Sequence, residues 1–126
     1  MSRRRAAANV IATAAAVMAL MGAGQAFGDA GENLDSSTVG SKTWSHENIG
    51  NKNVKVMDTE PDSHPVYSLY DRRTSTGKRL DNHKGNGETA KSGDDSRNYV
   101  TKVTACVNVQ LSPDRCGSDD RPGDGR

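Results

Sequence analysis

Apolar and polar residues alternate most regularly between positions 99 and 111. Six of the seven odd-numbered positions in this stretch are apolar, whereas only two of the six even-numbered positions are. A period of two is typical of a β-strand that buries one face. Thirteen residues are long enough for a bent strand or for two strands separated by a bulge. Ser112, Pro113 and Asp114 come next, and these residue types predict a turn that reverses the chain.

Shorter strands are predicted over 53–57, 66–70 and 77–81, where apolar residues cluster between turn residues. The pair Asn86-Gly87 predicts a hairpin turn, because a type I′ turn needs a positive φ at both central residues. Helix-forming patterns are nearly absent after residue 26. We therefore predict an all-β fold, a small antiparallel β-sandwich or barrel with one disulfide and disordered termini.

The first 26 residues are predicted to form a cleavable signal peptide. Three arginines precede a run of apolar residues from 6 to 22, and small residues at Gly24 and Ala26 allow a cut before Phe27. A second cut, before Gly31, stays open. The general secretory route fits best, and a twin-arginine route is the alternative. We therefore expect a secreted, extracellular protein with no stable membrane anchor after cleavage.

The rest of the chain divides into three parts by composition. Residues 27–43 are rich in Gly, Ser, Asp and Asn and predict a flexible lead-in, 44–117 predict the β domain, and 118–126 predict a disordered tail. Only 14 of the 100 residues after the signal are Leu, Ile, Val or Phe. The predicted core is therefore thin for an independent domain.

The charge balance changes once the signal is removed. The whole chain of 126 residues carries a formal net charge of +1, but the signal holds three arginines and no acidic residue, so residues 27–126 carry −2. A chain that is close to neutral gives no electrostatic reason to bind nucleic acid. We expect no nucleic-acid partner, and we expect a monomer.

Cys106 and Cys116 are the only cysteines. Leu111 lies midway between them, so a reversal of the chain after this residue would bring the two thiols together. Export favours oxidation, and the alternation places Cys106 on the polar face of its strand. We predict a disulfide that lies outside the apolar stripe.

Basic residues gather between positions 72 and 84, in an otherwise acidic chain. They are possible contacts for an anionic extracellular polymer such as a teichoic acid, although such a run is more often a solvated face. The candidates are Arg72, Arg73, Lys78, Arg79 and Lys84. The four aromatic side chains that could stack on sugar rings are expected to pack in the interior instead; they are Trp44, Tyr67, Tyr70 and Tyr99.

Candidate catalytic residues have no spacing that brings them together. A ribonuclease-like site would combine Glu60 or Glu47, His64, and Arg72 or Arg73. The acidic triplet at 58, 60 and 62 lacks the later residues of a calcium loop, and the glycines at 85 and 87 follow no buried strand and open no helix. We therefore predict no catalytic residue, no metal and no cofactor.

The Arg- and Ala-rich leader, the run Val-Tyr-Ser-Leu-Tyr at 66–70, and the segment 104–117 with its two cysteines resemble small secreted proteins of actinobacteria, a group without an assigned function. This resemblance implies an extracellular location and a β fold, and it carries over no catalytic residue. We expect a non-enzymatic protein that binds an extracellular polymer or protein partner. The alternative is a small secreted hydrolase or toxin, ribonuclease-like, that uses His, Glu and Arg.

Overall fold

The computed structural model describes residues 30–124. The predicted signal peptide at 1–26 lies outside the described residues. Within 30–124 no helix has the length and apolar character needed to cross a membrane. The described elements are eight strands and one short 3-10 helix. They are β1 (Leu34–Thr38), β2 (Ser41–Ser45), η3 (Glu47–Ile49), β3 (Lys55–Asp58), β4 (Val66–Arg72), β5 (Ser75–Asn82), β6 (Thr89–Lys91), β7 (Val100–Val107) and β8 (Arg115–Cys116).

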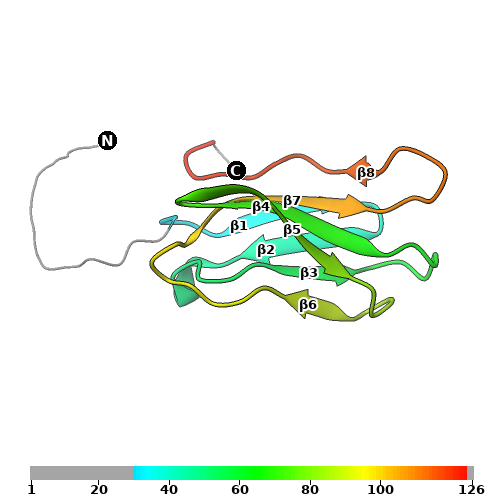
Figure 1. Ribbon diagram of the computed structural model, residues 1–126, viewed down its shortest axis with the longest axis horizontal. Helices are drawn as coiled ribbons and strands as arrows, with labels where there is room; N and C mark the ends of the chain where they lie inside the picture. The colour runs from blue at the N-terminus through cyan, green and yellow to red at the C-terminus, as the bar shows by residue number, and fades with distance from the viewer. Residues whose placement is uncertain (1–29, 125–126) are drawn as a thin grey trace, which may run out of the picture.

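The strands form two antiparallel sheets of four strands each. One sheet has the order β1-β2-β3-β6 and the other has the order β5-β4-β7-β8. Figure 1 shows β4 and β5 passing in front of β2 and β3, so the two sheets are stacked as layers. The predicted all-β fold is therefore confirmed, in the form of a β-sandwich.

The core consists of two apolar clusters with small polar residues between the sheets. One cluster contains Leu34, Val54, Tyr70, Val100 and Val103, and the other contains Val56, Val66, Ala90 and Val107. The hydroxyl oxygens of Thr43 and Ser68, from opposite sheets, lie 2.8 Å apart in the buried layer. Hydroxyl groups can be buried at low cost when they are hydrogen-bonded, so serine and threonine fill the places where apolar residues are few.

The long alternating segment forms one strand, β7, which is shorter than predicted. Asp71 pairs with Lys102 and Arg72 pairs with Val100, so Thr101 has no opposite residue and forms a bulge. The inward residues of β7 after the bulge, such as Val103, have odd numbers. The bulge shifts this alternation by one residue, so that the even-numbered Val100 also faces the core. The strand ends at Val107, and the fully exposed Leu111 has a φ of 64° in the turn that follows.

The structured region begins earlier than predicted. Residues 34–38 and 41–45, expected in a flexible lead-in and at the start of the domain, pair as the hairpin β1–β2. The connecting residues are Val39 and Gly40, and the φ of 98° at Gly40 suits a glycine. Leu34 is fully buried, and the other inward residues of these strands are Ser or Thr. Their polarity made the segment resemble a loop.

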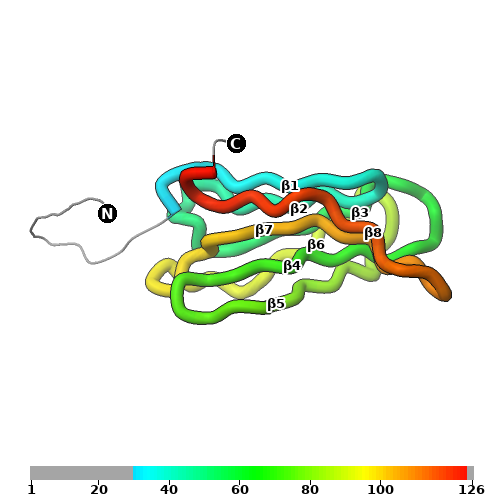
Figure 2. Tube along the Cα trace, turned by 90° about the horizontal axis from the view of Figure 1, so that it is seen from above, coloured from blue at the N-terminus to red at the C-terminus, as the bar shows by residue number. Residues whose placement is uncertain are grey.

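The segment after the disulfide also departs from the prediction, because residues 118–124 pack against the sandwich. Figure 2 shows this segment, in red, running beside β1. Asp120 is 3% exposed, exchanges backbone hydrogen bonds with Val103 and accepts one from the Asp35 amide through its carboxylate. The Ser36 hydroxyl donates to the Ser118 carbonyl. The backbone bonds extend the pairing of β7 beyond β8, and the bonds of Asp35 and Ser36 cover the outer edge of β1, which would otherwise be an unpaired strand edge.

The turn at Asn86-Gly87 is present but does not close a hairpin. It connects β5 in one sheet to β6 in the other, and β6 pairs with β3. The Gly87 amide donates to the Asp58 carbonyl, and the Asp58 amide donates to the Glu88 carbonyl. The turn therefore extends the β3–β6 pairing, and the short strand β6 was not predicted because three residues carry too little pattern.

Candidate functional site

The disulfide joins two directly opposed residues of β7 and β8. Cys106 pairs with Cys116 in the strand register, and their Cα atoms are 4.1 Å apart. Tyr67 lies beside Cys106 in the same row, on the face of the sheet that points away from the core. The predicted bridge and its position outside the apolar stripe are both confirmed.

Tyr67 is buried on this outer face by two polar neighbours. The Arg79 guanidinium lies 3.6 Å from the centre of the phenol ring, and the Tyr67 hydroxyl donates to Asp114 at 2.5 Å. Arg79 also contacts Asp81 at 2.9 Å. Burial, and then the hydrogen bond to Asp114, raise the pKa of Tyr67 above its ordinary value. Arg79 is thus held by an aromatic ring and a carboxylate.

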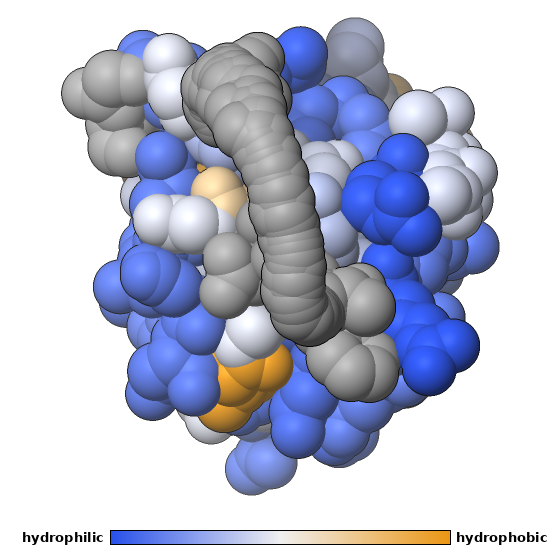
Figure 3. Space-filling view, turned by 90° about the vertical axis from the view of Figure 1, so that its left-hand side faces the viewer, coloured by the Kyte–Doolittle hydropathy of each residue, from blue (hydrophilic) through white to orange (hydrophobic). Residues whose placement is uncertain are grey.

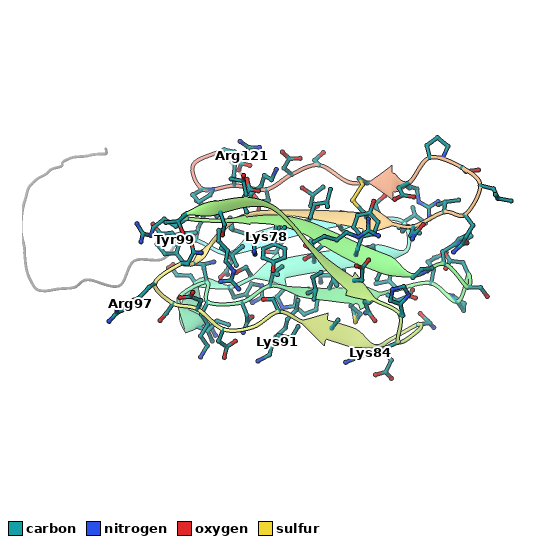
Figure 4. All side chains as sticks on the ribbon, viewed as in Figure 1. Lys78, Lys84, Lys91, Arg97, Tyr99 and Arg121 are labelled. Carbon is teal, nitrogen blue, oxygen red and sulfur yellow. A yellow bond between two sulfur atoms is a disulfide. The ribbon has the colours of Figure 1, made fainter. Side chains whose placement is uncertain are left out.

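Four of the five basic candidates lie exposed along β5 or just beyond its ends. Arg73 follows β4 in the turn into β5, Lys78 lies within β5, and Lys84 comes after it. Figure 4 shows Lys78 beside the middle of β5 and Lys84 near the turn into β6. β5 is an edge strand, bonded only to β4. We call Arg73, Lys78, Arg79 and Lys84 the basic edge.

Arg72 is different, because its side chain is buried between the sheets. It is 7% exposed, and its guanidinium donates to the backbone carbonyls of Lys52, Gly93, Asp95 and Asn98 and to the Ser92 hydroxyl. Successive residues of a strand point to opposite faces, so Arg72 points inward where Arg73 points outward. Arg72 therefore fastens two loops together and is not an exposed ligand contact.

The single tryptophan lies outside the core. Of the four aromatic residues expected in the interior, only Tyr70 packs in the core. Tyr67 is buried on the outer face of its sheet, Tyr99 is half-buried beneath Arg73, and Trp44 is half-buried on the outer face of the sheet β1-β2-β3-β6. The strand register gives this face two rows. Asp35, Trp44, Lys55 and Lys91 form one row, and Ser37, Lys42, Met57 and Thr89 form the other. We call these eight residues the tryptophan face. Small polar residues alternate with larger ones over 41–45 in the sequence. On hydropathy alone this alternation favours an inward-facing Trp44, whereas the structure has Ser41, Thr43 and Ser45 inside.

A cleft of about 480 Å³ lies between the β3–β4 and β5–β6 loops. Glu60, His64 and His83 line it together with Asp58, Ser63 and Asn86. The structure therefore brings together two of the proposed catalytic residues, Glu60 and His64, and adds His83. Glu47, Arg72 and Arg73 lie at the opposite end of the sandwich, since β4 begins beside the cleft at Val66 and ends at Arg72.

The cleft has few of the arrangements that catalysis requires. A nucleophile normally has a base within hydrogen-bond reach, but among residues 30–124 no hydrogen bond joins Ser63 to either histidine. His64 Nδ1 instead lies 2.9 Å from Gln110 Oε1. The carboxylates of Asp58 and Asp62 accept backbone amides two residues further on, which shapes the loop. These acidic residues serve the loop conformation.

One group of carboxylates in the described region is placed to hold a cation. Oxygen atoms of Glu32, Asp120 and Asp124 lie within 4.8 Å of one another, and such oxygen ligands suit a hard ion such as Ca²⁺. Part of this group is engaged by the protein, because Glu32 accepts the Gly123 amide and Asp124 accepts the Arg121 amide. Sequence reasoning missed the group because Glu32 lies about ninety residues before Asp120 and Asp124.

Hydrophobic surface is sparse at the end of the molecule that Figure 3 shows. That end is largely hydrophilic, with one strongly hydrophobic spot. The large hydrophobic residues exposed within 30–124 are Val39, Ile49 and Leu111, which lie in separate turns and in η3. They form no contiguous apolar patch of the size that a stable protein interface uses.

The chain was compared with protein-family models, with curated proteins and with solved structures, and no match was found in any of the three.

Proposed function

We propose that this protein is a non-enzymatic binding domain that works outside the cell and holds an anionic polymer of the cell surface at the basic edge. The disulfide supports the location, because such bonds persist in oxidising compartments. The predicted signal peptide agrees with it. Two features of the cleft support a role without catalysis. Among residues 30–124 no hydrogen bond joins Ser63 to a histidine, and Arg72 and Arg73 lie at the opposite end of the sandwich from the cleft.

The basic edge is the observation that carries this proposal. Arg73, Lys78 and Lys84 are exposed, and within 30–124 no carboxylate lies in ion-pair distance of any of them. Arg73 and Lys84 donate to backbone carbonyls, which leaves their charge uncompensated. A linear array of such cations suits a linear polyanion, and the attraction should weaken as salt rises.

The same cations have a purely structural alternative. Exposed edge strands often carry lysine and arginine because charge prevents pairing with a second copy of the chain. This alternative predicts that the loss of two lysines causes self-association. The binding proposal predicts that the protein stays monomeric and loses its polymer.

Co-sedimentation with washed cell walls, chitin and cellulose tests the proposal. We expect the protein to pellet with cell walls at low salt and to stay in solution at high salt. Lys78→Gln with Lys84→Gln should weaken pelleting about tenfold or more, since each lysine near an anionic surface contributes about 1 kcal/mol. The matched control is Lys52→Gln with Arg121→Gln, which removes two exposed cations that each face a carboxylate.

The outcomes distinguish polymer binding from protection of the strand edge. Retained pelleting of the Lys78/Lys84 variant, or equal loss in the control, contradicts the proposal. Size-exclusion chromatography of the same variants supplies the second measurement. If the Lys78/Lys84 variant formed dimers or larger species and still pelleted with cell walls, these lysines would serve to prevent the edge of β5 from pairing with a second copy of the chain.

A further inference from the structure

The strand β2 has an unusual distribution of side-chain sizes between its two faces. Its inward residues are Ser41, Thr43 and Ser45, whereas the largest side chain of the chain, Trp44, points outward. Tryptophan is usually the residue that a small core can least spare. A domain with few apolar residues thus leaves its only indole half-buried on an outer sheet face.

Cations surround this indole on two sides. Lys55 is directly opposite Trp44 on β3, and Lys42 Nζ lies 5.9 Å from the centre of the indole along the same strand. Within 30–124 neither lysine has a carboxylate in ion-pair distance. Lys91, next in the row, contacts Asp94 at 3.4 Å, and a hydrogen bond from Asn53 together with Lys91 lowers the pKa of that carboxyl.

Polar groups occupy the remaining side of the indole. Asp35 is opposite Trp44 on β1, and its carboxylate lies 3.4 Å from His46 Nε2. The His46 ring is 6.4 Å from the indole, measured between ring centres. The tryptophan face therefore offers, within neighbouring strands about 5 Å apart, a flat aromatic ring, two unpaired ammonium groups and a hydrogen-bonding carboxylate.

We propose that the tryptophan face binds an acidic polysaccharide, a chain of hexose units that carry carboxylates. One sugar ring would stack its C–H face on the Trp44 indole, because the electron-rich face of an aromatic ring attracts polarised hydrogens. Lys42 and Lys55 would hold carboxylates of that unit or the next. Asp35 would accept hydrogen bonds from sugar hydroxyls.

The number of aromatic rings favours this ligand over single-stranded nucleic acid. Nucleic-acid platforms combine a strongly positive groove with several aromatic rings for successive bases. Here only one ring is present among the eight residues of the face, so it offers no platform for successive bases. A polyanion without rings would use the lysines alone and would leave the indole without a role.

This site is independent of the basic edge, because the two surfaces belong to different sheets and share no residue. Their tests are therefore separable. Trp44 is the only tryptophan, so its fluorescence reports on this face without interference from any other indole.

The first experiment titrates the protein with polygalacturonate and follows the fluorescence of Trp44. We expect a saturable change that is absent with fully methyl-esterified pectin, which has the same rings without charge. We also expect little change with polyphosphate, which has charge without rings. A response to a single-stranded oligonucleotide that exceeds the response to polygalacturonate would overturn the assignment, as would no response to polygalacturonate.

The second experiment measures the retardation of variants in native gels that contain polygalacturonate, because Trp44→Ala removes the fluorophore. Trp44→Ala and the pair Lys42→Gln with Lys55→Gln should each weaken binding about tenfold or more, and Trp44→Phe should lose less. Lys52→Gln with Arg121→Gln, outside both the tryptophan face and the basic edge, is the matched control of equal charge and should bind as before. Circular dichroism verifies that each variant is folded. Unchanged retardation of a folded Trp44→Ala protein would mean that the indole only covers the sheet.

Discussion

The buried arginine allows the sharpest test of how this small domain is held together. Replacement of Arg72 by leucine keeps an apolar stem of similar length but removes every donor of the guanidinium. Three of its hydrogen bonds are short, at 2.7 Å to Gly93, 2.8 Å to Asn98 and 3.1 Å to Lys52. These acceptors belong to two separate loops, so the substitution releases one loop from the other.

The expected loss follows from the number and kind of these bonds. A hydrogen bond to a charged donor contributes about 1.5–3 kcal/mol, so three of them set an upper range of about 5–9 kcal/mol. Part of this is recovered, because residues 93–97 are exposed and their carbonyls can bind water once the arginine is gone. We therefore expect Arg72→Leu to lower the free energy of unfolding by about 3–4 kcal/mol. Total stability of small domains is about 5–15 kcal/mol.

Urea unfolding followed by circular dichroism measures this quantity. The matched control is Arg73→Leu, an exposed arginine one residue later, which should change stability by no more than about 0.5 kcal/mol. Arg72→Lys keeps the charge and some donors and should lie between the two. A loss below about 1 kcal/mol for Arg72→Leu, or equal losses for both arginines, would refute the argument that the guanidinium joins the loops.

Further predictions concern single positions. A Cβ at residue 117 would lie 2.1 Å from the Ser37 carbonyl oxygen, so Gly117→Ala should separate β1 from the C-terminal segment and lower the melting temperature, while Gly93→Ala, with open space around it and no positive φ, should not. Ser41 has a fully buried hydroxyl without a hydrogen-bond partner, so Ser41→Ala should leave stability unchanged or raise it by about 1 kcal/mol in urea unfolding. The raised pKa of Tyr67 means that its neutral form stabilises the fold at pH values below about 10, and this contribution is lost as the pH rises through the raised value. Alkaline absorbance titration should show a late-ionising phenol that is missing in Tyr67→Phe.

The elements predicted correctly are those in which valine and tyrosine mark the inward face. β7 and the turn after it followed from alternation and from Pro113, and together they place Cys106 opposite Cys116. The hairpin of β1 and β2 was missed for a physical reason. Its inward side chains are mostly serine and threonine, whose burial depends on hydrogen bonds such as the one from Ser36 to Ser118, and hydropathy alone does not detect those bonds.

The candidate site was predictable in part. Four residues of the basic run between 72 and 84 lie exposed on or beside the edge strand β5, and the parity of β4 already distinguishes Arg72 at its end from Arg73, which follows it. Val66 and Tyr70 point inward, and Arg72 has the same parity. Glu60 and His64 are close in sequence and meet in one cleft, whereas His83 joins them only because β5 returns along β4. The pairing of β5 with β4 is a tertiary contact, which cannot be predicted from the spacing of residues in the sequence.

The interior also explains why the outward tryptophan requires a cause beyond folding. Thr43 and Ser68 join the two layers through their hydroxyls, so small side chains occupy the space between the sheets next to position 44. An indole turned inward here would overfill that space, which accounts for its absence from the core. It does not account for an indole on the outside. Threonine, valine or isoleucine at position 44 would suit a half-exposed strand equally well and would leave less apolar surface in water. The position of this ring between Lys42 and Lys55 agrees with the proposed contact to a sugar ring outside the domain.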